Sequence, residues 1–83
     1  MEEAKELYSS GTEKSILGCM FLDRAAAEMG RNTLKAEDFY IPTYRAIFEA
    51  MQAVEVIDIM TVWNELQRRG EGERISVDML RDI

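Results

Sequence analysis

The chain contains no histidine, and it has one cysteine, Cys19, and one proline, Pro42. Without histidine, the chain cannot form a Ser–His–Asp or Cys–His nucleophile system, a His-ligated metal site or a His-based pH switch. A single thiol also excludes an internal disulfide and a thiolate zinc site, and it is compatible with a reducing compartment.

Long apolar runs are missing as well. No uninterrupted apolar stretch approaches the ~18–20 residues that span a bilayer. No charged segment followed by an apolar one opens the chain, so we expect no membrane association and no export. We therefore expect a cytoplasmic protein.

Basic charge is scarce. Ten Lys and Arg residues stand against sixteen Asp and Glu residues, which gives a net charge of −6. Nucleic-acid backbones are bound by clustered Lys and Arg, so direct nucleic-acid binding is not expected and a protein partner is favoured.

The 83 residues that are present, 47% hydrophobic and 31% charged, are typical of one small globular domain. Nothing alternates with period two, so an all-α fold is expected. Residues 1–11 are predicted to be a lead-in segment and residues 12–83 the helical domain.

Local signals predict where the first helices begin and end. Ser10 and Glu13 have the spacing of a capping box, followed by a helix to about Leu22. Asp23 is expected to cap a short helix over 24–29, with Gly30 as its stop.

The second half of the chain has similar signals. A helical turn is expected at 36–39, and Pro42 suits the first turn of a helix that runs to about Ala53. Asp58 is expected to cap a helix over 59–69 that ends at Gly70, and Ser76 to cap a last helix over 77–83.

The apolar residues of these helices recur at helical spacing and form stripes that face one core. The predicted core consists of Ile16, Leu17, Met20, Phe21, Phe39, Ile47, Phe48, Met51, Val62 and Leu66.

Few residues stand apart from these stripes. Trp63 lies beside the stripe of its helix, with Met60 three residues earlier on the same flank, a combination typical of binding edges. Core-rim packing is the alternative for Trp63. Cys19 is expected to be half-buried and structural, because no histidine or helix dipole activates it.

Charged and glycine-rich segments have simple interpretations. The pair Glu37–Asp38 and the C-terminal carboxylates lack the spacing of a calcium loop and are expected to be solvated. Gly70 and Gly72 have neither the strand nor the Lys-Ser/Thr context of a phosphate loop. The pair Arg68–Arg69 suits the C-terminal end of a helix dipole.

Three ordered stretches are more specific than their composition: TEKSILGCMFLD at 12–23, EDFYIPTYRAIFEAM at 37–51 and IDIMTVWNELQRRG at 57–70. Together they resemble the N-terminal domain of bacterial replicative DNA helicases of the DnaB type. The family patterns read A-E-Q-x-x-L-G-x-x-x-x-D, D-F-Y-x-P-x-H-x-x-I-F-x-A-M and I-D-x-x-T-L-x-x-x-L-x-x-x-G. The resemblance covers about residues 12–70.

The resemblance implies an orthogonal bundle of about five to six short helices. It also implies a non-catalytic domain that docks the helicase-binding domain of primase and neighbouring helicase subunits during DNA replication. No Walker motif occurs in the chain, so ATP and magnesium belong to the family's separate ATPase domain, and no cofactor or metal is expected here. We expect Met60, Trp63 and Tyr44 to form the partner-binding surface.

The chain departs from the family pattern at several positions. Tyr44 stands where the family usually has histidine, the loop between Met51 and Ile57 is short, and the helical hairpin that pairs subunits is absent. Two alternatives therefore stay open, a free-standing adaptor or regulator of a helicase and the related helicase-binding domain of primase itself.

Overall fold

The computed structural model describes residues 10–83, with side chains from residue 11. This part contains five α-helices, one 3-10 turn and no strand. The elements are α2 (Ser10–Leu22), α3 (Arg24–Thr33), η1 (Ala36–Asp38), α4 (Pro42–Ala53), α5 (Ile59–Arg68) and α6 (Val77–Asp82). The all-α prediction is confirmed. Residues 1–9 of the predicted lead-in lie outside the described residues.

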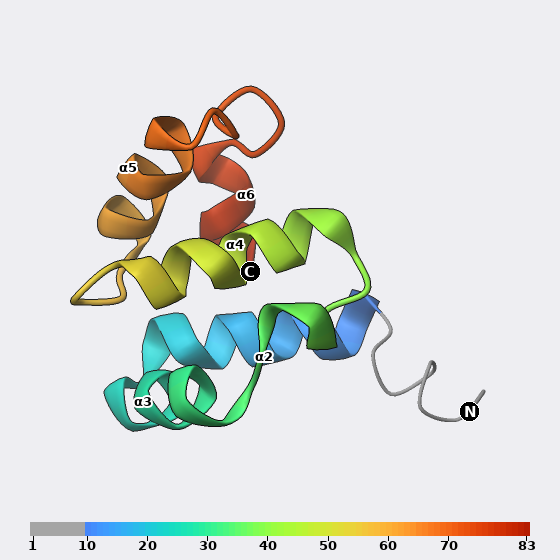
Figure 1. Cartoon of the computed structure of the whole chain (residues 1–83), viewed down its shortest axis with the longest axis vertical. Helices are drawn as coiled ribbons and strands as arrows, with labels where there is room; N and C mark the ends of the chain where they lie inside the picture. Colours follow the sequence, from blue (N-terminus) through green and yellow to red (C-terminus); the bar gives the residue numbers. More distant parts are fainter. Residues whose placement is uncertain (1–9) are drawn as a thin grey trace.

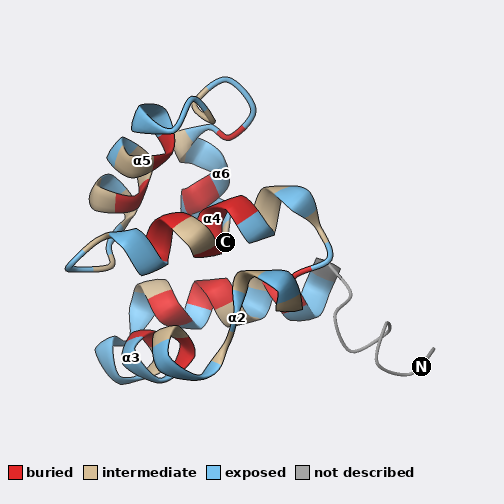
Figure 2. Ribbon diagram, viewed as in Figure 1, coloured by how far each residue is buried: buried red, intermediate tan, exposed pale blue. Residues whose placement is uncertain are grey.

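Helix α4 is the centre of the bundle. It lies between the α2–α3 pair on one side and the α5–α6 pair on the other (Figure 1). Buried residues gather on α4 and on the sides of the neighbouring helices that face it (Figure 2). One core therefore joins both helix pairs.

Local caps fix most of the helix starts. The Asp23 carboxylate accepts the Ala25 N–H, and the Ser76 hydroxyl accepts the Met79 N–H. Asp58 and Thr61 form a capping box, and Pro42 occupies the first turn of α4. These predicted starts are confirmed.

The buried apolar core contains most of the residues in the predicted stripes. Its members are Leu17, Met20, Ala27, Phe39, Ala46, Ile47, Phe48, Ala50, Met51, Val62, Leu66, Ile75 and Leu80. Ile16 and Phe21 are only partly buried and pack against it. Ile75 was not foreseen, although its place before the cap Ser76 and five residues before Leu80 is that of a hydrophobic staple.

The prediction that Gly30 ends the second helix is wrong. Helix α3 continues to Thr33, and the Leu34 N–H donates to the Gly30 carbonyl. Gly30 is buried, and a Cβ atom there would lie 2.8 Å from the Met20 sulfur. The missing Cβ of Gly30 therefore makes room for the buried Met20 side chain and does not mark a helix stop.

The structure also gives Glu13 a different role from that of a local capping partner. Its carboxylate is fully buried and accepts the N–H groups of Tyr40 at 2.9 Å and Ile41 at 3.2 Å. These groups precede α4, whose N-cap residue Ile41 offers no side-chain cap. Glu13 therefore caps α4 from another helix, while the side chain of Ser10 lies outside the described ones.

Arg31 of α3 supports the opposite end of the same helix. Its Nη2 donates to the carbonyls of Met51 at 2.9 Å and Val54 at 2.6 Å. An anion at the N-terminal end and a cation at the C-terminal end both match the dipole of α4. Helices α2 and α3 thus hold the central helix by its two ends.

Candidate protein-docking surface

Helix α5 carries two of the three predicted docking residues. Met60 is 55% exposed. Trp63 is partly buried, packs against the core, and lines a hollow of about 400 Å³ with Gln67, Gly70, Gly72 and Glu73. Met60 and Trp63 therefore lie on one flank of α5, but they do not line the same hollow.

Tyr44 lies on a different helix from Met60 and Trp63. It belongs to the first turns of α4, is partly buried, and packs against the core. It is not among the residues that line the hollow beside Trp63. Met60 and Trp63 therefore lie on one helix, α5, and Tyr44 on another, α4.

The helix that presents Met60 and Trp63 is well fixed at both ends. Asp58 accepts the Thr61 N–H at 2.8 Å, and the Thr61 hydroxyl accepts the Asp58 N–H at 3.1 Å. At the other end, Gly70 adopts the left-handed φ of 81°, which glycine reaches without strain. Two caps on ten residues make α5 a rigid platform.

Ion pairs reinforce the last turn of α5. Glu65 Oε2 accepts from Arg68 Nη2 at 2.6 Å and from Arg69 Nε at 2.8 Å, and Arg69 Nη1 lies 3.9 Å from Glu49 Oε1 of α4. The hydrogen bonds from Arg68 and then Arg69 lower the pKa of Glu65 from 4.5 to about 2. The same carboxylate raises the pKa of Arg68.

This shift predicts an acid dependence. Because the folded pKa of Glu65 is lowered, its pairing stabilises the fold above about pH 4.5, and the contribution is lost as the pH falls toward 2. Carboxyl carbon shifts of Glu65, followed by NMR, should titrate near 2. Arg68→Gln should move that midpoint toward 4.5, whereas Arg81→Gln, which removes a pair on α6, should leave it in place.

A second hollow lies between α2 and α3. It has a volume of about 370 Å³ and is lined by Ser15, Ile16, Cys19, Met20, Ala26, Met29, Gly30, Thr33 and Leu34. Met29 is 68% exposed. Cys19 is exposed too, so the expectation of a half-buried thiol is wrong. Cys19 is two residues from the buried Leu17, which places it on the opposite side of α2.

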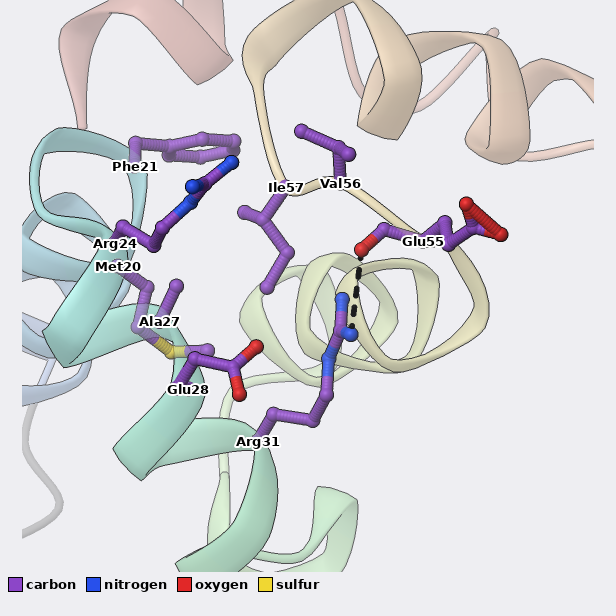
Figure 3. Close-up of a pocket in the computed structure, with 9 residues that line it drawn as sticks. All are labelled: Met20, Phe21, Arg24, Ala27, Glu28, Arg31, Glu55, Val56 and Ile57. Carbon is purple, nitrogen blue, oxygen red and sulfur yellow. Dashed lines mark hydrogen bonds between the residues drawn. The ribbon is translucent and has the colours of Figure 1, made fainter.

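A third cavity of about 450 Å³ lies where the α2–α3 corner meets the loop between α4 and α5 (Figure 3). Its walls are Met20, Phe21, Arg24, Ala27, Glu28, Arg31, Glu55, Val56 and Ile57. Its walls combine apolar side chains with two arginines and two glutamates. The sequence offered no signal for this cavity, because its residues come from three separate segments.

The described residues contain no group of three or more His, Cys, Asp or Glu side chains that could hold a metal ion. None of the helices in that same part of the chain is long and apolar enough to cross a membrane. What the surface offers is apolar side chains on fixed helices, an arrangement suited to binding another protein.

Comparison with known proteins identifies the family of the chain. The family model described as "DnaB-like helicase N terminal domain" matches residues 5–83. The chain belongs to this family. The DnaB-like domain described here is also 39% identical over 67 residues to the replicative DNA helicase DnaB of Geobacillus stearothermophilus.

The match covers 76% of this chain but only 15% of that helicase. The chain thus spans a small part of its curated relative. No solved structure matches the chain significantly. Within the DnaB-like domain, Glu13 is the residue of the first motif that reaches across to α4, so this part of the motif has a structural explanation.

Proposed function

We propose that this DnaB-like domain is a non-catalytic docking domain of a replicative DNA helicase. Its partners would be the helicase-binding domain of primase and neighbouring helicase subunits. Membership of the family supports the helicase context. The observation that carries the docking role is the exposed Met60 beside Trp63 on the doubly capped α5. Apolar side chains held on a rigid helix are common anchors of protein interfaces.

The chemistry of the whole protein would lie elsewhere. By resemblance to the family, ATP and magnesium would be bound by an ATPase domain, and this domain would hold no cofactor. The excess of acidic residues supports a protein partner over direct nucleic-acid binding. The working compartment would be the cytoplasm.

Mixing the domain with the C-terminal domain of its cognate primase tests the proposal. Light scattering should detect a mixed complex, and calorimetry should give its Kd. Met60→Ala and Trp63→Ala should each weaken binding by about tenfold, because central aromatic and apolar anchors dominate interface energies. Met29→Ala removes a methionine from α3 that is more exposed than Met60 and should change Kd by less than about twofold, as truncation away from the contact does.

Two results would contradict the proposal at different levels. No complex with the unmodified domain would reject primase as the partner. A complex that Met60→Ala and Trp63→Ala leave at full affinity, with both variants folded by circular dichroism, would reject α5 as the docking surface.

A further inference from the structure

The hollow beside Trp63 lies at an accessible end of the molecule. Its walls come from α5 and from the turn that follows this helix, and they are Trp63, Gln67, Gly70, Gly72 and Glu73. In Figure 1 this turn projects from the end of the bundle opposite to α2 and α3. The volume of about 400 Å³ leaves room for a long side chain of another protein.

Two glycines leave the backbone bare in the walls of this hollow. A Cβ atom placed on Gly70 would meet no atom within 4 Å beyond its chain neighbours, so the space there is open. The carbonyls of Gly70 and Gly72 accept no hydrogen bond from residues 10–83. The walls therefore offer backbone acceptors in addition to the Trp63 ring.

The one charge in the walls is negative. Among the described residues that line the hollow, Glu73 alone is charged. Its side chain is exposed and forms no hydrogen bond or ion pair with the part of the chain that the structure describes. An aromatic ring and an unpaired carboxylate thus lie in one hollow.

The arginines near this hollow are engaged by other carboxylates. Arg68 and Arg69 both donate to Glu65. Arg74 donates to Glu71. These pairs leave the carboxylate in the wall of the hollow without a cation from its own neighbourhood, so a cation from a partner would complete it.

Arginine is the side chain that fits this lining best. Its guanidinium is planar, stacks on the face of an indole ring and carries five N–H donors for carboxylate and carbonyl acceptors. The ammonium of lysine is a compact, strongly hydrated charge without a plane that can stack. An acidic or purely apolar side chain would leave the Glu73 carboxylate uncompensated.

We propose that the hollow receives an arginine side chain of the protein partner, which stacks on the Trp63 ring and donates to Glu73. This inference rests on the proposed docking function and names the chemistry of one contact. Met60 precedes Trp63 by three residues on the same flank of α5, so a partner that covers Met60 continues onto the hollow. The net charge of −6 also favours a basic partner surface.

The direct test uses the complex with the C-terminal domain of the cognate primase. Trp63 is the single tryptophan of the chain, so its ring protons are identified without ambiguity. With the primase domain labelled with ¹³C and the DnaB-like domain unlabelled, isotope-filtered NOEs from this ring should reach the side chain of an arginine. NOEs that reach only other residue types, lysine included, would overturn the proposal.

Charge and ring variants measure the same contact through Kd. Glu73→Gln should weaken binding about fivefold at low salt, the upper range for an exposed ion pair, and less at high salt. Trp63→Leu keeps an apolar side chain but removes the ring face, and should also cost about fivefold. Glu28→Gln makes the same charge change at an exposed site on α3 and should change Kd by less than about twofold.

The outcomes separate this contact from the docking function. If the complex forms but Glu73→Gln changes Kd no more than Glu28→Gln does, the arginine contact is overturned and docking stands. If the unmodified domain does not bind primase, docking to primase and this contact are both rejected. If light scattering shows that Glu73→Gln dissociates a dimer of the domain itself, the occupant is a second copy and the proposed contact with a partner is overturned.

Discussion

Replacing Glu13 by alanine should lower the free energy of unfolding by about 3 kcal/mol, since hydrogen bonds to a charged acceptor contribute about 1.5–3 kcal/mol each. The carboxylate is fully buried and accepts two N–H groups at the start of α4. Alanine leaves both donors without this acceptor and removes an anion from the positive end of the helix dipole. Urea unfolding followed by circular dichroism at 222 nm measures the change.

Graded and matched variants make this result specific. Glu13→Gln keeps one acceptor oxygen and should cost about half as much, because only the charge and one hydrogen bond are lost. Glu37→Ala removes an exposed glutamate from η1 and should stay within about 0.5 kcal/mol of the original protein. A Glu13→Ala domain as stable as the Glu37→Ala domain would show that Glu13 does not hold α4.

Features of the fold that depend on neighbouring residues were predictable from the sequence. Asp23, Asp58 and Ser76 cap the helices that follow them because a short polar side chain reaches the free N–H groups two or three residues ahead. Gly70 ends α5 for an equally local reason, its left-handed backbone conformation. The helical periodicity likewise identified Leu17, Ile47 and Leu66, all of which are fully buried.

Features that depend on contacts between distant segments were not predictable in this way. Gly30 looks like a helix stop, but its missing side chain makes room for Met20. Glu13 has the spacing of a local cap, but it caps a helix that begins almost thirty residues later. Arg31 gave no signal at all, because its acceptors are carbonyls at the end of another helix.

The same distinction between features set by neighbouring residues and features set by distant segments applies to the candidate site. Met60 and Trp63 were predicted to lie on one flank because both belong to one helix, where spacing in the sequence determines their relative position. The cavity that contains Arg24, Arg31 and Val56 draws its walls from two helices and a loop. Only the folded arrangement brings these residues together, so the cavity has no signature in the sequence.

The largest loss of stability is expected for Phe48→Ala, about 4 kcal/mol, as for other buried phenylalanines truncated to alanine. Phe48 is fully buried in the middle of α4 and stacks on Phe39, with ring centroids 4.9 Å apart. Truncation leaves a cavity where both helix pairs meet. A domain of this size has about 3–5 kcal/mol of core stability in total, so the variant should be largely unfolded at 25 °C.

A smaller change keeps the effect measurable. Phe48→Leu should retain the fold and cost about 1.5 kcal/mol, the upper range for apolar replacements of similar volume. A double-mutant cycle with Phe39→Leu then isolates the ring contact, which should couple the two positions by about 1 kcal/mol. Additive losses from the two leucine variants would show that the rings do not interact. In that case η1 and α4 would be held together by Glu13 and the Arg45–Phe39 hydrogen bond instead of by aromatic stacking.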